Sequence, residues 1–455
     1  MKPLVLVALL AGAVAAQPAA KPAPAAKSTL SLPSIETFTL DNGLQVAFMH
    51  RDGAPVVSVE VWYHVGSKDE PRNRRGSAHM FEHIMFKGTE HVPPEAHAKE
   101  LNRLGGYVNA QTTEDATHYI NLLPADYLDF ALQLEAERMR HLLFREDMIK
   151  TEREVVKEEI RQQDNNPLLK AVNKFLAAAY TKHPYAWTAA GNIADLDATT
   201  PDDLHKFYDL YYQPNNALLV VVGNVTREQV ETSAKKWFGA IPKGATPPRP
   251  ADEATEPAQT EQRKVTSEPA QLGVIIAGYH VPAAKEQDIY GLQVLSLILG
   301  GGESSRLMQR IKQPIDPKAK QPKPLGVAAG TQILVHEQPG LLLVVGAFLD
   351  PANQQQVQDA LFDEVQKLAT KGPDANELRK AKNQIQASYV YGLESVGGIA
   401  EQIGESWILT GDPARWLKEV DEFEKVTAAD VMRLAKQYLD PKTATILVVP
   451  PAGAQ

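Results

Sequence analysis

The stretch His79-Met80-Phe81-Glu82-His83 lies inside a longer run, Ser77 to Thr89, in a chain of 455 residues. If this run is helical, His79 and His83 stand one turn apart on the same face. Two imidazoles placed in this way can bind one Zn²⁺, and Glu82 is close enough to the same side to reach a metal-bound water. Short motifs also arise by chance at helix ends, so the neighbouring sequence has to decide between the two interpretations.

Length and composition indicate a multidomain globular protein. A chain of 455 residues exceeds the size at which single hydrophobic cores stop growing, so two or more domains are expected. Apolar residues make up 44% and charged residues 23%, as in soluble globular proteins. The net charge of −9 argues against nucleic acid as a partner. The chain has no cysteine, so a zinc site must be built from histidines and carboxylates.

The N-terminus is typical of an export signal. Lys2 precedes a short apolar run, residues 3–14, and small residues that can serve as a cleavage site follow. We expect residues 1–16 to be a signal peptide and the alanine- and proline-rich residues 17–33 to be a tether. A lipobox is excluded without cysteine, so we expect a periplasmic or secreted protein with no membrane span after signal cleavage.

The two halves of the sequence repeat one pattern. Tyr63-His64-Val65 closes an expected strand in the first half, and Tyr279-His280-Val281 closes one in the second. Segments 200–222 and 427–449 also align without a gap, each running from a helix start into an apolar strand. A proline-rich stretch, residues 244–262, is typical of a linker between the copies. The expected domains are residues 34–243 and 263–455.

The repeat provides an internal control for the motif. When the alignment of the two Tyr-His-Val tripeptides is continued without gaps, Leu295 stands opposite His79, Ile298 opposite Glu82 and Leu299 opposite His83. The fold therefore does not require those polar residues, which favours a functional role for them. By the same control His64 and His280, which occupy equivalent strand ends, are expected to serve the fold rather than catalysis.

A carboxylate is needed as a third ligand, because a catalytic zinc usually has three from the protein. The helix expected over residues 145–163 is rich in glutamate, although such runs are mostly solvated. Glu152 and Glu159 are seven residues apart and share a face, whereas Glu158 is rotated away from it. That face suits one ligand and one supporting carboxylate. The residues expected to mark the buried side are Val155, Val156 and Ile160.

Several further segments accompany the motif. They are residues 86–89, 105–110, 152–160, 183–185 and 211–217. With His79-Met80-Phe81-Glu82-His83 they resemble the pitrilysin/insulinase family of zinc peptidases, the inverzincins, in the branch of mitochondrial processing peptidase and its exported bacterial relatives. By this resemblance His79, His83 and Glu159 are the zinc ligands. Glu82 is the general base, and Glu152 supports the site.

The resemblance also implies a fold and an activity. Each copy is expected to be an α+β sandwich, a mostly antiparallel sheet flanked by helices, with the two copies arranged as a clamshell. Residues 34–243 would form the zinc-binding peptidase domain and residues 263–455 a peptidase-like domain without the motif. One Zn²⁺ per chain would serve an endopeptidase acting on unfolded peptides, with Asn109 and Ala110 on the strand that pairs with substrate backbone.

The second half departs from the family pattern. Active single-chain relatives carry an arginine and a tyrosine there, seven residues apart, which help to bind the substrate carbonyl. In this chain the two positions align with Lys312 and Ala329, on either side of an insertion-like run, residues 313–324. We therefore expect a homologous sister subunit without the zinc motif to supply the pair in a heterodimer. The alternative is a non-catalytic scaffold or a peptide-binding subunit of the same fold.

Overall fold

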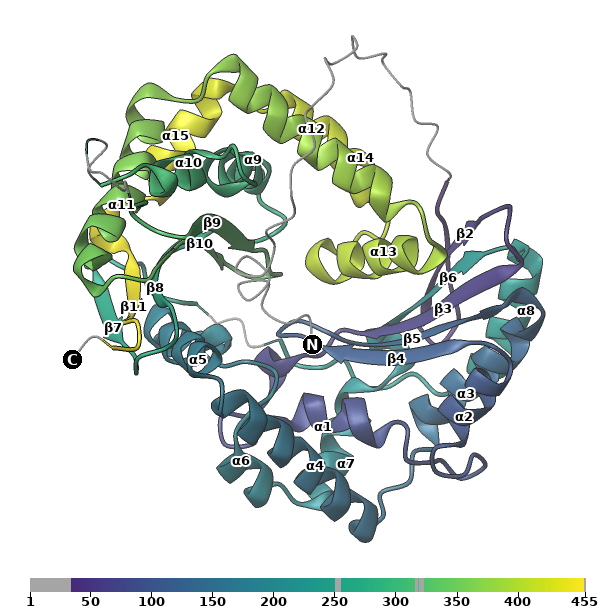
Figure 1. The fold of residues 1–455 in the computed structure, drawn as a ribbon. Coiled ribbons are helices and arrows are strands. Elements are labelled where there is room, and N and C mark those ends of the chain that lie inside the picture. The colour runs from purple at the N-terminus through teal and green to yellow at the C-terminus, as the bar shows by residue number, and fades with distance from the viewer. Residues whose placement is uncertain (1–33, 250–254, 316–317, 319–322, 454–455) are drawn as a thin grey trace.

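The computed structural model describes residues 34–249, 255–315, 318 and 323–453. The expected signal peptide and tether lie outside the described residues. Figure 1 shows two sheets with their helices, one from each half of the chain, curving toward one another like the shells of a clam. This two-domain arrangement of sheets flanked by helices confirms the fold class expected from the sequence.

The N-terminal sheet has six strands in the order β1-β2-β6-β3-β5-β4. They are β1 (Glu36–Thr39), β2 (Gln45–His50), β3 (Val56–Tyr63), β4 (Tyr107–Thr112), β5 (Thr117–Pro124) and β6 (Ala217–Gly223). β2 and β6 run parallel, and the other neighbours are antiparallel. The turn between β1 and β2 contains Gly43 with φ +90°, a backbone conformation that glycine adopts without strain.

The C-terminal sheet repeats five of these strands. They are β7 (Arg263–Thr266), β8 (Gly273–Val281), β9 (Ala328–Leu334), β10 (Gly340–Phe348) and β11 (Thr445–Val449). Their order, β7-β11-β8-β10-β9, matches β2-β6-β3-β5-β4, and again only the first pair is parallel. The two halves therefore share one topology, as the internal sequence repeat predicts.

The helices pack around these sheets. Those of the first half are α1 (Ser77–Ile84), α2 (Ala96–Arg103), α3 (Leu128–Arg140), α4 (Glu146–Asp164), α5 (Pro167–Ala179), α6 (Ile193–Ala198), α7 (Pro201–Tyr211) and α8 (Arg227–Phe238). Those of the second half are α9 (Asp288–Gly300), α10 (Arg306–Lys312), α11 (Gln354–Lys371), α12 (Ala375–Gly392), α13 (Val396–Thr410), α14 (Trp416–Lys425) and α15 (Ala428–Tyr438). Both α7 and α15 begin with a threonine capping box, Thr200 with Asp203 and Thr427 with Asp430, at equivalent points of the repeat.

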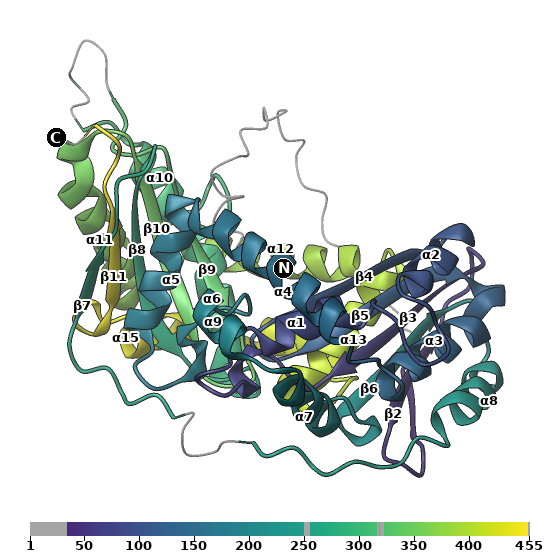
Figure 2. The same cartoon turned by 90° about the horizontal axis from the view of Figure 1, so that it is seen from below.

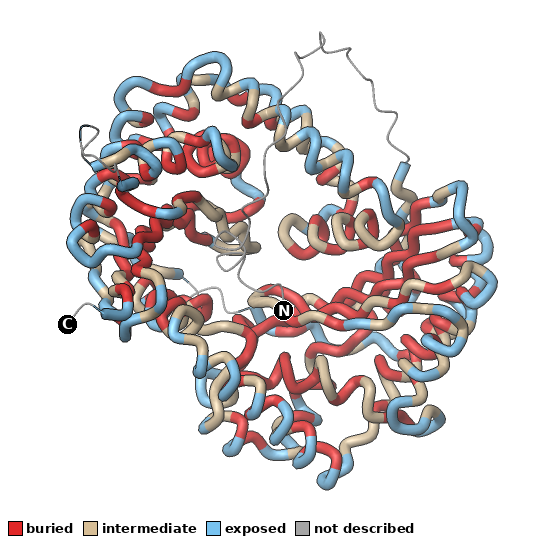
Figure 3. The backbone as a smooth tube through the Cα atoms, in the orientation of Figure 1, coloured by how far each residue is buried: buried red, intermediate tan, exposed pale blue. Residues whose placement is uncertain are grey.

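Each half also covers one face of the other half's sheet. In Figure 2 α5 lies against the C-terminal sheet, where its Phe175 joins a buried cluster with residues of β8, β10 and β11. In Figure 1 α13 lies over the N-terminal sheet, where Ile403 and Trp407 join Trp62 and Val220 in a second cluster. The inner strands β3, β6, β8 and β10 are buried along almost their whole length, and therefore on both faces, as their red segments in Figure 3 indicate. The two halves therefore share their cores.

Candidate metal centre

The motif lies on α1, which packs against β4, β5 and α4. Met80, Phe81 and Ile84 point into the N-terminal core, because their spacing places them on one side of the helix. The remaining face carries His79, which is buried, and Glu82 and His83, which are partly buried. The amphipathic pattern of α1 thus turns all three polar side chains of the motif to the side away from the core.

The helix α4 brings Glu159 to this face. One atom each of His79, His83 and Glu159 lies within 4.8 Å of the other two. Glu159 Oε2 is 3.6 Å from His79 Nε2, and Glu159 Oε1 is 3.7 Å from His83 Nε2. Atoms bound at ordinary zinc–ligand lengths in a tetrahedron stand about 3.4 Å apart. These three donors therefore fit a zinc ion.

The protonation of the site suits metal binding and proton transfer. Burial and the neighbouring His83 lower the pKa of His79 to about 3, so its imidazole is neutral and available as a ligand. Burial raises the pKa of Glu82, which makes this carboxylate a better proton acceptor. Glu82 Oε2 is buried and has no hydrogen-bond partner within the described parts of the chain. It is therefore free to accept a proton from a bound water.

Glu152 contacts the far side of one candidate ligand. Its Oε2 lies 3.5 Å from His83 Nδ1, and its Oε1 lies 3.1 Å from Lys87 Nζ. Burial alone would raise the pKa of Glu152, but the hydrogen bonds to His83 and Lys87 outweigh it and lower that pKa. A carboxylate on the second nitrogen of a ligating histidine fixes the ring's tautomer and orientation.

Lys87 is a residue that the sequence interpretation missed. Its ammonium bridges Glu152 and Glu95, whose Oε1 is 2.5 Å away. The sequence spacing could have indicated this role, because Lys87 follows His83 by four residues within the same run, Ser77 to Thr89.

One residue expected on the buried side of α4 is not there. Val156 and Ile160 are buried, but the side chain of Val155 is exposed. The reason is helical geometry, since consecutive residues are turned by about 100° and Val155 therefore stands about 140° around the helix from the buried Ile160. That expectation was wrong, whereas the shared face of Glu152 and Glu159 does not depend on it.

Asn109 and Ala110 lie on β4, at the edge of the N-terminal sheet. Among the described residues β4 pairs with β5 alone, and Asn109 stands opposite Ile120. The Asn109 amide donates a hydrogen bond to the Tyr107 hydroxyl at 2.9 Å. Neither residue belongs to the metal-donor group, and in the described part of the chain no strand pairs with the outer edge of β4.

The second copy has no comparable site in its described residues. Leu295, Ile298 and Leu299 lie on α9 and are buried in the C-terminal core. Lys312, at the end of α10, pairs with Glu303, and Ala329 on β9 lies opposite Gly346 of β10. The two positions at which the family pattern has an arginine and a tyrosine are therefore occupied by a lysine and an alanine in this chain.

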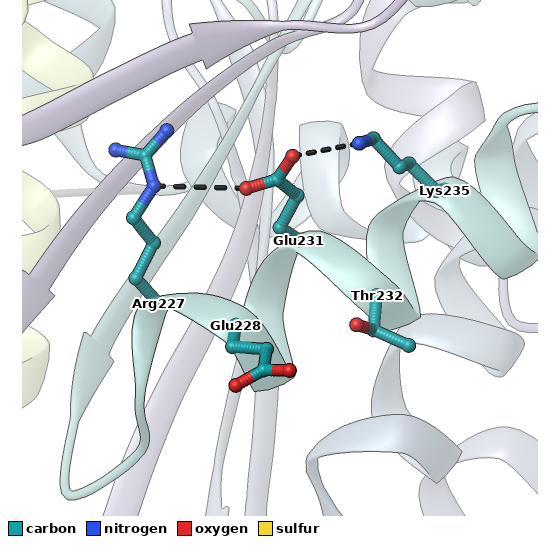
Figure 4. Close-up of a pocket in the computed structure, with 5 residues that line it drawn as sticks. All are labelled: Arg227, Glu228, Glu231, Thr232 and Lys235. Carbon is teal, nitrogen blue, oxygen red and sulfur yellow. Dashed lines mark hydrogen bonds and ion pairs between the residues drawn. The ribbon is translucent and has the colours of Figure 1, made fainter.

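A shallow depression elsewhere on the N-terminal half is lined by four charged residues and one threonine. Figure 4 shows its lining residues on α8, where Glu231 pairs with Arg227 at 3.7 Å and with Lys235 at 2.7 Å. Because these charges satisfy one another along an exposed helix, the depression has the character of a solvated helix face.

Comparison with known families and proteins agrees with the geometry. Residues 45–191 match the family described as insulinase (peptidase family M16), and residues 198–385 match the family described as peptidase M16 inactive domain. The chain is 32% identical to the zinc protease PqqE of Helicobacter pylori, over 92% of this chain and 94% of that protein. It is 28% identical to the uncharacterized zinc protease YmxG of Bacillus subtilis, over 91% and 98%.

Solved structures show the same fold. A protease from Helicobacter pylori superposes with a TM-score of 0.85 at 31% identity, covering 92% of this chain and all of that one. The first half of the periplasmic protease PqqL from Escherichia coli gives 0.75 at 20% identity, covering 92% and 93%, a likeness of fold alone. In the described part of this chain no helix is both long and apolar enough to span a membrane.

Proposed function

The chain belongs to the insulinase family, peptidase family M16, and from this premise we propose that it is a zinc-dependent endopeptidase acting on unfolded peptides. The observation that carries the proposal is the convergence of His79, His83 and Glu159 from two helices, with Glu82 on the same face. The family relationship makes zinc the expected metal, and we propose one ion per chain. By the resemblance described above, we place the chain near mitochondrial processing peptidase.

The proposed reaction assigns one task to each side chain. A bound zinc would polarise the scissile carbonyl and lower the pKa of a water to about 7. Glu82 accepts the proton of the attacking water and delivers it to the leaving amine. Glu152 holds the ring of His83 in the orientation that its ligand nitrogen requires, and Lys87 holds Glu152.

The open edge of β4 supports binding of an extended substrate. A peptide that adds to this edge forms main-chain hydrogen bonds, which select an extended conformation more than a particular sequence. We propose that it runs along Asn109 and Ala110. Because α1 packs against β4, a peptide on this edge would pass beside the metal-binding face.

We further propose that a homologous subunit without the zinc motif completes the site. The supporting observation is the asymmetry of this chain, which has all four metal and base residues but Lys312 and Ala329 where the arginine and tyrosine would stand. Export to the periplasm or exterior fits the signal-like residues 1–16. It also fits the likeness of fold to PqqL, which is a periplasmic protease.

The test compares the wild-type chain with Glu82→Gln, with and without the candidate sister chain. Both proteins should bind one zinc, and only the wild type should cleave an unfolded peptide, most strongly in the mixture. Glu158→Gln serves as a control, because Glu158 is exposed on α4 and pairs with Arg161. Zinc binding without any difference in cleavage between wild type and Glu82→Gln would favour the scaffold or peptide-binding alternative.

A further inference from the structure

The loop before α1 contains a buried carboxylate that the proposed reaction does not use. Only 5% of Glu70 is exposed. Its Oε2 accepts a hydrogen bond from the Gly76 amide at 2.9 Å, and its Oε1 accepts one from the Ala78 amide at 2.7 Å. Both oxygens are therefore directed at the N-terminus of the helix that carries the metal-binding motif.

The start of α1 needs an external partner of this kind. The first amide groups of a helix have no acceptor within the helix. Gly76 occupies the N-cap with φ +97° and has no side chain to supply one, and the first turn contains no acidic residue. A residue with a side chain would be strained at this φ, and its Cβ would stand 2.9 Å from Leu196 Cδ2 and 3.3 Å from the Ala190 carbonyl oxygen. Glu70 supplies the missing acceptors, and although burial raises the pKa of Glu70 to about 8, the hydrogen bonds from the Gly76 and Ala78 amides act to lower that pKa.

The second copy shows that the fold does not require this arrangement. The alignment that places Leu295 opposite His79 places Glu286 opposite Glu70. Glu286 is exposed, and α9 begins two residues later without a side-chain cap. A buried carboxylate at this point therefore accompanies the metal-binding residues, and the copy without them forms its equivalent helix in another way.

The segment that carries Glu70 is held by both halves of the protein. Lys68 Nζ lies 3.0 Å from Asp115 Oδ1 and 3.1 Å from Glu337 Oε2 of the C-terminal half. Asp69 Oδ2 accepts a hydrogen bond from the Gly66 amide at 3.0 Å. These contacts are largely buried, so the loop presents the Glu70 carboxylate to α1 in one fixed position.

We propose that Glu70 is a positioning residue of the metal centre. It fixes the first turn of α1, and with it the direction in which His79 and Glu82 leave the helix. The Ala78 amide that it binds belongs to the residue next to His79, so a displacement there moves the histidine directly. The inference rests on the proposed function, since it assumes that α1 carries metal ligands.

Glu70→Gln tests the proposal, with Glu286→Gln as the matched control. Glutamine keeps the size of the side chain, but its nitrogen cannot accept from the second amide. We expect the variant to fold. Its zinc affinity, measured by competition with a chelator, or its kcat should fall by about 10- to 100-fold, as for other residues that orient metal ligands. KM should change little, because the substrate edge of β4 is untouched. The Glu286→Gln protein should match the wild type in all three quantities.

Two results with the Glu70→Gln variant would overturn the proposal. One is a folded Glu70→Gln protein with the zinc affinity and kcat of the wild type, and the other is a variant that fails to fold, which would make Glu70 a general stability residue. Hydrogen exchange on the wild type adds a test without mutation, since the Gly76 and Ala78 amides should exchange slowly, and exchange at unprotected rates would refute the cap. If the wild type binds no zinc, the proposed function fails, while the exchange measurement still reports on the cap itself.

Discussion

Glu60 should make the stability of this protein fall as the pH rises. The residue lies on β3, on the face of the N-terminal sheet that carries Trp62 and that α13 covers, and it is 1% exposed. Burial raises the pKa of Glu60 from 4.5 to about 8, although Trp62 Nε1 and Ser58 Oγ donate hydrogen bonds to it at 2.9 and 3.2 Å. The carboxyl is therefore protonated in the folded chain at pH values where the unfolded chain has lost the proton.

The size and sign of the effect follow from proton linkage. Between the two pKa values the unfolded state binds fewer protons than the folded state, so stability decreases with pH and the loss is complete above the folded pKa. The limiting slope is about 1.4 kcal/mol per pH unit. Integrated from pH 5 to pH 8, Glu60 should cost roughly 3 kcal/mol of unfolding free energy.

The assay compares wild type with Glu60→Gln by urea unfolding at several pH values, with metal removed by a chelator from both. The amide stays neutral, and Ser58 Oγ can accept from it while Trp62 continues to donate. The variant should gain roughly 3 kcal/mol relative to wild type between pH 5 and pH 8, and taking the difference cancels the other titrating groups. For Glu228→Gln, an exposed change on α8, the free energy of unfolding should depend on pH in the same way as for the wild type. The same pH dependence for wild type and Glu60→Gln would refute the reasoning.

Three other perturbations have defined outcomes. Glu159→Gln should lose most of its zinc on dialysis, measured by metal analysis, whereas Glu158→Gln should keep it; equal zinc contents would contradict the ligand assignment. Lys68→Met leaves the buried carboxylate of Asp115 and the partly buried carboxylate of Glu337 without their cation and should cost about 3–5 kcal/mol in urea unfolding. An unchanged midpoint would show that the ion cluster is dispensable. Gly404→Ala places a Cβ 2.0 Å from Trp62 and should lower the free energy of unfolding by about 1–3 kcal/mol. Gly397→Ala lies in the same helix with open space at its Cβ, so it should not destabilise the protein. Equal thermal midpoints for the two alanine variants would contradict the close packing of α13.

The sequence predicted what local signals and repetition can encode. Thr200 and Thr427, with an aspartate three residues later, mark helix starts that the structure contains. The expected role of His64 and His280 in the fold agrees with their contacts. His64 Nε2 lies 2.8 Å from Glu337, and His280 Nε2 lies 3.0 Å from the Ala179 carbonyl, both across the boundary between the halves.

The contacts between the halves could not be predicted. The apolar run of β6 indicates a strand buried on both faces, but not that α13, almost two hundred residues later, covers one of them. Lys68, Asp69 and Glu70 have the composition of a solvated loop, and only the tertiary structure shows that they are buried against partners from distant segments. For the candidate site, spacing placed Glu152 and Glu159 on one face, whereas their different contacts with His83 depend on how α4 lies against α1.

The exchange of α5 and α13 between the halves has a consequence for biosynthesis. As the chain emerges, the N-terminal sheet keeps an uncovered apolar face until the last sixty residues or so are available, because α13 spans Val396–Thr410 of 455 residues. A chain that ends before α13 would leave that apolar face exposed. Exposed apolar faces favour association between molecules, so early termination or cleavage before α13 should produce an aggregation-prone fragment.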